Sequence, residues 1–385
     1  MDTVNSRTWI DASAEPLAAH AERDLAALVD VSSPSGDVEA AESVVAVATA
    51  LLPDGVETER LECSSPDHAP DLLAHMRGTG ERRLLLLGHL DTVIPHAAHH
   101  PLRREGELLR GPGTIDMKGG VALSIGVLRA LTERREDFDE VALLLVVDEE
   151  WRSVPFVHAE RFTDFDACLC FEGGELTEDG DDAVVVNRKA AGTIRVAATG
   201  RAAHSGSEPE EGRNALLALA RVAQILAGHD APEGPNRLTV VPTILSSGDA
   251  FNIVPGDGEL FADVRAASLG AIEAVMDDLP DEIDGVELNA EMTRRWPAMQ
   301  MAERAAAPLA LASELLGRPI VGAERGGASD ASHLAAGAPL LAIDGLGPLG
   351  GGSHAPDEHV VAESLRTRAE VALALVASVL SGAAA

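Results

Sequence analysis

The sequence predicts an α/β protein in which a mixed, mostly parallel sheet flanked by helices is interrupted by a smaller inserted α+β domain. Short apolar runs separated by helical stretches occur towards both ends of the chain, and this alternation is typical of buried parallel strands with crossover helices. Between residues 192 and 297 the order changes to strand, helix, two strands, helix and strand, which is typical of a two-layer unit. A chain of 385 residues is long enough for two such domains.

The first part of the chain predicts helices and buried strands. Helical spacing of apolar residues covers 17–30, 37–52 and 121–134, and apolar runs that predict strands cover 83–88, 141–147 and 166–171. In parallel sheets, ligands bind beyond the carboxyl ends of the strands. Each of the three apolar runs is followed at once by ionisable residues. The sequence therefore places a functional site at that edge of the sheet.

The inserted segment predicts the order β-α-β-β-α-β. Its strands are expected over 193–200, 237–247, 259–267 and 286–293, and its helices over 213–228 and 269–279. The first pattern resumes near Ala305 with a helix, an apolar run over 339–347 and a last helix over 362–381. We therefore expect one domain from residues 1–191 and 298–385, and an inserted domain from residues 192–297.

The chain is strongly acidic, because 63 Asp and Glu against 30 Lys and Arg give a net charge of −33. This charge argues against nucleic acid or an anionic membrane surface as a partner. No stretch reaches the roughly 18 to 20 apolar residues of a membrane span, and the first residues lack a basic segment followed by an apolar run. Cys63, Cys168 and Cys170 form no disulfide framework. We expect a soluble, cytoplasmic protein.

Two motifs near the first strand carry candidate metal ligands. His89 and Asp91 lie on one face of an extended segment, so Asp91 can orient the His89 imidazole in the way that carboxylates orient metal-bound histidines. Asp116 follows a glycine-rich turn and precedes a helix. A structural role is the alternative for both motifs, since His-x-Asp is short and Asp116 can cap the helix.

Three further motifs supply carboxylates and a second histidine. Residues 148–150, Asp-Glu-Glu, end a strongly apolar strand, where clustered carboxylates repel one another unless a cation relieves them. A solvated acidic loop is the alternative. Glu172 ends the next apolar run, and His354 lies in a glycine-rich loop. The five motifs together offer two histidines and four carboxylates, a set that suits a pair of divalent ions, with zinc preferred.

These motifs, GHLDTV, GPGTIDMKGG, DEEW, FEGG and GGGSHAPDE in this order, resemble those of the dinuclear zinc metallopeptidases. That family includes glutamate carboxypeptidase, cytosolic dipeptidases, aminoacylase, succinyl-diaminopimelate desuccinylase and acetylornithine deacetylase. In the inserted domain, residues 200–206, 212–215 and 252–255 resemble the family's lid and dimerisation domain. The resemblance covers nearly the whole chain. It implies two Zn²⁺ per subunit, with Co²⁺ or Mn²⁺ as possible substitutes, and a homodimer.

Carried over residue by residue, the resemblance implies a role for each motif. The implied assignments are His89 and Glu172 on one zinc, Glu150 and His354 on the other, Asp116 bridging both, Asp91 orienting His89, and Glu149 as general base. The family's lid histidine donates to the oxyanion, which implies that role for His204, with an ordinary surface histidine as the alternative. Asn252 and Arg265 would hold the substrate, and for Arg265 a structural ion pair with Asp263 is the alternative.

Residues 326–360 and the Gly-Pro-Gly turn before Asp116 look more like the glutamate carboxypeptidase branch than the desuccinylase or acetylornithine branches. The expected activity is hydrolysis of a small-molecule amide, dipeptide or N-acyl amino acid that releases a C-terminal amino acid. An N-acyl amino acid deacylase is the alternative enzyme, and a noncatalytic, metal-stabilised binding protein is the alternative outside enzymes. Trp151 and Arg152 stand where relatives commonly have a glycine, which predicts an altered pocket wall.

Overall fold

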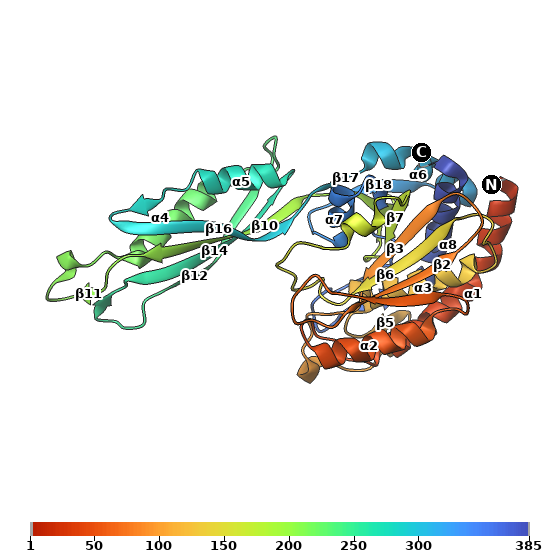
Figure 1. The fold of residues 1–385 in the computed structure, drawn as a ribbon, viewed down its shortest axis with the longest axis horizontal. Helices are drawn as coiled ribbons and strands as arrows, with labels where there is room; N and C mark the ends of the chain where they lie inside the picture. The colour runs from red at the N-terminus through yellow and green to blue at the C-terminus, as the bar shows by residue number, and fades with distance from the viewer. Residues whose placement is uncertain (1–2, 384–385) are drawn as a thin grey trace. The chain divides into compact units, whose positions relative to one another are not determined.

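The computed structural model describes residues 3–383, and the chain divides into two compact units (Figure 1). The first unit contains Met1–Asn187, Met299–Arg325 and Ser329–Ala385, and the second contains Arg188–Ala298 with Gly326–Ala328. The first unit is therefore built from both ends of the chain, and the second is an insertion in it.

A six-stranded sheet lies at the centre of the first unit, with the strand order β1-β2-β6-β3-β7-β19. In that order the strands span Glu57–Leu61, Asp71–Arg77, Glu140–Val146, Arg83–His89, Ala167–Cys170 and Leu341–Ile343. Strand β3 is parallel to both β6 and β7, and β7 is parallel to β19. Strands β2 and β1 add antiparallel pairings at one edge. The mixed, mostly parallel sheet predicted from the sequence is confirmed.

Helices cover this sheet and account for its uninterrupted apolar strands. They are α1 (Thr3–Val29), α2 (Val38–Leu51), α3 (Gly119–Leu131), α6 (Ala302–Leu316), α7 (Asp330–Gly337) and α8 (Ser364–Ser378). Helix α3 packs on β3 and β6, α7 packs on β7 and β19, and α1 packs on α3 and α8 (Figure 1). Every residue of β6 is buried. Parallel strands buried on both faces are apolar throughout because neither face meets water.

Two smaller sheets complete the first unit. One has the order β17-β9-β18, with β8 paired to β9, and its strands span Met299–Gln300, Asp182–Arg188, Ile320–Arg325 and Glu175–Leu176. The other has the order β20-β21-β5-β4, with strands Gly350–Gly351, His359–Val361, Leu108–Arg110 and Arg103–Glu105. The second of these sheets joins the loop that follows β5 to the loop between β20 and β21.

The second unit is a five-stranded antiparallel sheet with two helices. The sheet order is β12-β14-β10-β16-β15, and the strands span Thr239–Ser247, Asp257–Ala266, Ala190–Thr199, Val286–Trp296 and Glu282–Ile283. Helices α4 (Ala215–Gly228) and α5 (Leu269–Asp277) pack on it, and a two-stranded pair joins β11 (Ala203–His204) to β13 (Ile253–Val254). The main elements follow the predicted βαββαβ order.

Some elements differ from the expectation. Helix α1 begins at Thr3, well before the expected start at residue 17, although Pro16 lies inside it. A continuous buried stripe explains the length: Ile10, Ala14, Leu17, Ala21, Leu25 and Leu28 recur at intervals of three or four residues. Strand β2 was not expected, and its pairing with β6 is a tertiary contact. Among the residues described, no helix is both long and apolar enough to cross a membrane.

Candidate metal centre

Three parallel strands deliver ionisable residues to one edge of the central sheet. His89 is the last residue of β3 and pairs in register with Val146, the last residue of β6, while Leu87 pairs with Cys170 at the end of β7. Glu149, Glu150 and Glu172 follow within a few residues of those strand ends. Because parallel strands end at the same edge, the loops that follow them converge.

A first group of possible metal ligands consists of His89, Asp116 and Glu172, with one ligand atom from each lying within 4.8 Å of the others. The His89 Nε2 atom is 3.1 Å from Asp116 Oδ1 and 3.8 Å from Glu172 Oε1. The other ring nitrogen, Nδ1, donates to the Asp91 carbonyl oxygen at 3.0 Å. That bond keeps Nε2 turned towards the carboxylates, as in metal-bound histidines.

A second group consists of Asp116, Glu150 and His354, which meet the same 4.8 Å criterion. His354 Nε2 is 3.1 Å from Asp116 Oδ2 and 3.1 Å from Glu150 Oε2. Ser353 Oγ also donates to Asp116 Oδ2 at 2.6 Å. Asp116 belongs to both groups and turns one carboxylate oxygen to each histidine. The structure thus brings together all five residues that the sequence analysis assigned to two ions.

Asp91 supports the centre in a way that its motif did not indicate. Its Oδ1 accepts from the Glu149 backbone N–H at 3.2 Å, and its Oδ2 accepts from the Glu150 backbone N–H at 3.1 Å. Asp91 Oδ1 is also 3.4 Å from His89 Nδ1. One buried carboxylate therefore holds both the imidazole and the turn that carries the two glutamates.

The two histidines and the carboxylates of the centre shift one another's pKa values. Hydrogen bonds to Asp116 and Glu150 raise the pKa of His354 to about 10. Burial alone would lower the pKa of His89, but its hydrogen bonds to Asp116 and Asp91 outweigh burial and raise it well above the ordinary value. Burial likewise favours a high pKa for Asp116, yet the contacts with His354 and His89 hold it below the usual range. The carboxylates of the site are therefore stabilised by positive charge placed between them.

Glu149 lies beside this centre in a different environment. Burial raises its pKa well above the usual value, and the negative charges of Asp330, Glu172 and Glu150 add to the effect against the opposing His89. A carboxyl group with a raised pKa takes up a proton readily near neutral pH. Glu149 is thus suited to accept a proton, while Glu150 faces His354.

The residues present fit two divalent metal ions. Imidazole nitrogen and carboxylate oxygen are ligand atoms that Zn²⁺ and related ions prefer. The Oε1 atom of Glu150 is buried and has no hydrogen-bond partner, an arrangement that is costly without a cation. Each ion would also replace the protons that now balance the carboxylates.

The second unit brings His204 and Asn252 together. His204 pairs with Ile253 between β11 and β13, and the Ser205 N–H donates to the Asn252 carbonyl oxygen at 3.0 Å. His204 Nδ1 accepts from the backbone N–H groups of Gly206 and Ser207 at 3.1 and 3.0 Å. The neutral ring therefore carries its proton on Nε2, and this N–H can serve as a donor.

Arg265 is engaged within its own strand. Its Nε and Nη2 atoms donate to the two carboxylate oxygens of Asp263 at 2.9 and 3.0 Å. This bidentate ion pair is the structural alternative that the sequence left open. A substrate contact by Arg265 remains a prediction, and the observed geometry does not favour it.

Two charged residues outside the proposed ligand set make buried or half-buried contacts near the centre. Arg325 donates to the carbonyl oxygens of Gly173 and Gly174 at 2.9 and 3.4 Å, directly after Glu172. Lys118 is buried and donates to the Val31 carbonyl oxygen at 2.8 Å, and burial lowers its pKa to about 7. Both contacts join segments far apart in the sequence, so local patterns could not reveal them.

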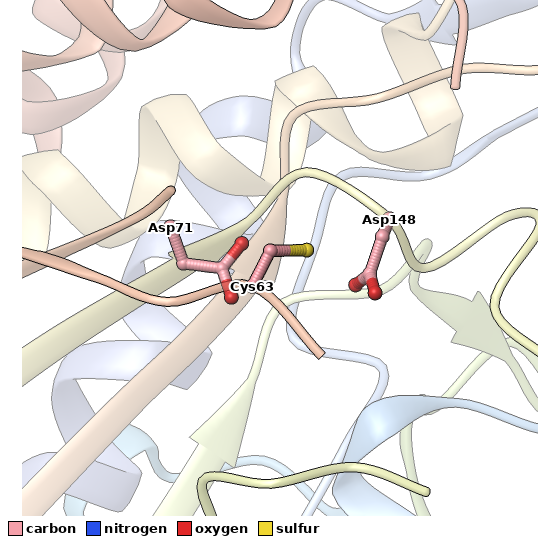
Figure 2. Close-up of side chains that lie close together, drawn as sticks. All are labelled: Cys63, Asp71 and Asp148. Carbon is pink, nitrogen blue, oxygen red and sulfur yellow. The ribbon is translucent and has the colours of Figure 1, made fainter. Parts of the chain in front are cut away.

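A third cluster contains Cys63, Asp71 and Asp148, whose side chains lie close together (Figure 2). Its carboxylates already have partners. Asp71 accepts from the Val147 N–H at 3.0 Å and contacts His158 Nε2 at 2.7 Å, and Asp148 accepts from the Ser65 N–H at 2.9 Å. Burial raises the pKa of the Cys63 thiol well above its usual value, whereas metal binding requires a thiolate. This cluster is a hydrogen-bonded network and a poor cation site.

Arg152 connects that network to helix α7. Its guanidinium donates to Asp148 Oδ1 at 2.9 Å and to Asp330 Oδ1, and the Arg152 side chain is 0% exposed. A guanidinium between two buried carboxylates offsets charges that would otherwise be unpaired. An arginine four residues after Asp148 was a visible signal, but its second partner lies 178 residues away.

The chain matches the sequence profile of Peptidase family M20/M25/M40 over residues 85–378. It belongs to this family. Two relatives are each 28% identical: carboxypeptidase G2 of Pseudomonas sp. (strain RS-16), aligned over 94% of this chain and 89% of the relative, and succinyl-diaminopimelate desuccinylase of Alkalilimnicola ehrlichii, over 84% and 90%. Membership makes the chain a hydrolytic enzyme of a dinuclear metal-binding family. It argues against the alternative of a noncatalytic, metal-stabilised binding protein.

Solved structures of M20 enzymes show the same fold. A tripeptidase from Staphylococcus aureus superposes with a TM-score of 0.75 at 20% identity, covering 95% of this chain and 99% of that chain. The YXEP protein of Bacillus subtilis, a dinuclear metal-binding peptidase from the M20 family, superposes with a TM-score of 0.67 at 16% identity, covering 94% and 99%.

Replacing Arg152 with alanine should strongly destabilise the first unit. The substitution leaves Asp148 and Asp330 buried without their cation, so we expect a loss of about 3 to 5 kcal/mol in the free energy of unfolding. The matched control is Arg60→Ala, which removes a partly exposed pair with Glu42 and should cost at most about 1 kcal/mol. Guanidinium chloride unfolding measures both. Equal, small effects would show that the Arg152 network does not hold the fold.

Loading the metal-free protein with Zn²⁺ at pH 7 should release protons. His354, with a pKa raised to about 10, is protonated at this pH and must lose a proton before Nε2 can bind metal, and the same applies to His89. Metal affinity should therefore fall as the pH is lowered. Titration in weakly buffered solution with an indicator dye should record about two protons for two ions. A His229→Gln variant is the control, and binding without proton release would contradict the charge balance described above.

Proposed function

We propose that this enzyme uses two Zn²⁺ ions to hydrolyse an amide bond and release a C-terminal amino acid, as a carboxypeptidase. The observation that carries the proposal is the pair of ligand groups that share Asp116 beside the buried Glu149. The 28% identity to carboxypeptidase G2 over 94% of this chain supports the same choice. His89 and Glu172 would hold one ion, Glu150 and His354 the other, and Asp116 would bridge them.

The residues divide the chemistry between them. When bound, two metal ions polarise the scissile carbonyl and lower the pKa of the attacking water. Glu149 takes the proton of that water on its carboxylate and delivers it to the leaving amine nitrogen. Asp91 keeps the Glu149 and Glu150 backbone in place and orients His89. The high proton affinity of Glu149 suits a group that accepts a proton and then gives it up within one turnover.

His204 would stabilise the oxyanion of the tetrahedral intermediate. The two backbone N–H groups that bind its Nδ1 leave the Nε2 proton available for donation. Asn252, next to His204 through the Ser205 contact, would hold the substrate from the same loop pair. Both roles are carried over from the family resemblance, in which the lid domain acts on the substrate.

An N-acyl amino acid deacylase is the second candidate. It is favoured by the equal 28% identity to a succinyl-diaminopimelate desuccinylase. Trp151 bears on the choice because its side chain is 61% exposed directly after Glu150 and lies near Gly36. Gly36 belongs to a turn whose Ser35 N–H donates to the Thr92 carbonyl oxygen, next to Asp91. Trp151 would therefore form part of the pocket wall and affect substrate choice more than metal binding.

We also propose a homodimer formed through the second unit. Strand β12 is an edge strand of the antiparallel sheet, and Val241, Ile244 and Leu245 on it are exposed. An exposed, apolar edge strand is a liability that pairing with a second copy removes.

We place the enzyme in the cytoplasm, because its three cysteines are buried and unpaired, as is usual in a reducing compartment.

The activity can be tested with the zinc- or cobalt-loaded protein on dipeptides, N-acyl amino acids and folyl-type glutamates. We expect release of a C-terminal amino acid, and a loss of roughly 10²- to 10⁴-fold in kcat for Glu149→Gln with unchanged metal content. Glu62→Gln, an exposed change of the same kind, should leave kcat unaltered.

The substrate that is cleaved separates the two candidate enzymes. Cleavage of dipeptides or folyl-type glutamates supports the carboxypeptidase, while cleavage confined to short N-acyl amino acids supports the deacylase. Turnover that survives Glu149→Gln would overturn the assignment of the general base.

The dimer can be tested by sedimentation equilibrium. The wild-type protein should have about twice the mass of the 40.0 kDa chain, because pairing covers the apolar edge. Ile244→Glu places a charge on that edge and should yield monomers, while Val38→Glu, an exposed change in the first unit, should not. A wild-type protein that is monomeric at micromolar concentrations would refute this interface.

A further inference from the structure

Glu358 lies where two loops of the metal centre meet. Strand β21 pairs with β5 so that His359 is opposite Arg110, and the Gly111 N–H donates to the Glu358 carbonyl oxygen at 3.2 Å. The chain preceding β21 carries His354, and the chain following β5 carries Asp116. The backbone pairing therefore places Glu358 against the turn that leads to Asp116.

The carboxylate of Glu358 binds that turn directly. Its Oε2 accepts from the Gly113 N–H at 2.8 Å, and its Oε1 accepts from the N–H groups of Ile115 and Asp116 at 2.9 and 3.1 Å. Glu358 is only 3% exposed, so water cannot easily replace it as the acceptor for these three groups. An ionised carboxylate can accept all three at once because its two oxygens offer about four acceptor sites.

These bonds act on the residue shared by both ligand groups. The Asp116 N–H is held by Glu358, while the Asp116 side chain meets His354 Nε2 at 3.1 Å and Ser353 Oγ at 2.6 Å. Removing the Glu358 side chain would leave the β21–β5 pairing and the Gly111 contact in place, since both involve backbone atoms. The carboxylate therefore holds the turn over residues 113–116 together with the Thr114 contacts to the Gly111 carbonyl oxygen.

We propose that Glu358 is a positioning residue that fixes Asp116 relative to His354 and so sets the affinity for the ion held by Asp116, Glu150 and His354. This inference rests on the two-ion centre of the proposed function. Two of that ion's three ligands, Asp116 and His354, come from the loops that Glu358 joins. In the other group, which contains His89, Asp116 and Glu172, only Asp116 comes from these loops. Loss of the carboxylate should therefore weaken one ion more than the other.

The test is a Co²⁺ titration of the metal-free, full-length protein, followed by calorimetry and visible absorption, with thermal unfolding recorded in parallel. The variants are Glu358→Ala, which removes all three acceptor bonds, and Glu358→Gln, which keeps one carbonyl oxygen. Asp357→Asn is the matched control, because it removes one carboxylate charge from the exposed neighbouring residue.

Wild type and Asp357→Asn should bind two Co²⁺ ions with the same spectrum. In Glu358→Ala one ion should bind as in wild type and the other roughly 10- to 100-fold more weakly, as found when groups that support metal ligands are lost. Glu358→Gln should be intermediate, since it retains part of the acceptor capacity. This graded and unequal effect is one that a merely structural role would not produce.

Two results would overturn the inference: unchanged binding of both ions by Glu358→Ala, or equal weakening of both ions together with a large fall in the unfolding temperature. Failure of the proposed function would look different. A wild-type protein that binds two Co²⁺ ions but cleaves none of the substrates would contradict the function while leaving the Glu358 comparison intact. Wild-type protein that cannot bind two ions would overturn both.

Discussion

The charge of Asp116 has to be balanced where its side chain is only 22% exposed, and the rest of the centre is arranged around that requirement. Its two oxygens face His89 and His354, and the same carboxylate belongs to both ligand groups. Buried carboxylates are tolerated only when cations or hydrogen-bond donors compensate them. The two histidines face its oxygens, and two divalent ions would supply the positive charge that these carboxylates favour. The carboxylates of the centre therefore favour the binding of positively charged ions.

Three of the four loops that carry proposed ligands are held by a charged side chain from elsewhere in the chain. Asp91 binds the turn of Glu149 and Glu150, Arg325 binds the loop after Glu172, and Glu358 binds the turn of Asp116. Loops are usually the more mobile parts of a protein. Here the buried contacts give them the fixed geometry that a metal centre requires. Precision at the site depends on these supporting residues as well as on the ligands.

Much of the site could be predicted from the sequence because its five motifs are local. His89 and Asp91 are two residues apart, Glu149 and Glu150 are adjacent, and three of the motifs end an apolar run that is recognisable as a strand. Family membership confirmed the broad interpretation as a hydrolytic, dinuclear metal-binding enzyme. For Arg265 the sequence left a substrate contact and an ion pair with Asp263 both open, and the structure shows the ion pair.

The sequence by itself determined the α/β class and the order of the motifs, and it predicted the inserted domain, because periodicity and strand-end chemistry are local properties of the chain. Only the tertiary structure decided how His89, Asp116 and His354 are grouped, because their side chains meet across separations of 27 and 238 residues. It also revealed that Glu358 binds the turn before Asp116 and that Arg152 reaches Asp330 in helix α7. Hydrogen bonds between segments far apart depend on strand register and helix packing, and no local pattern encodes them.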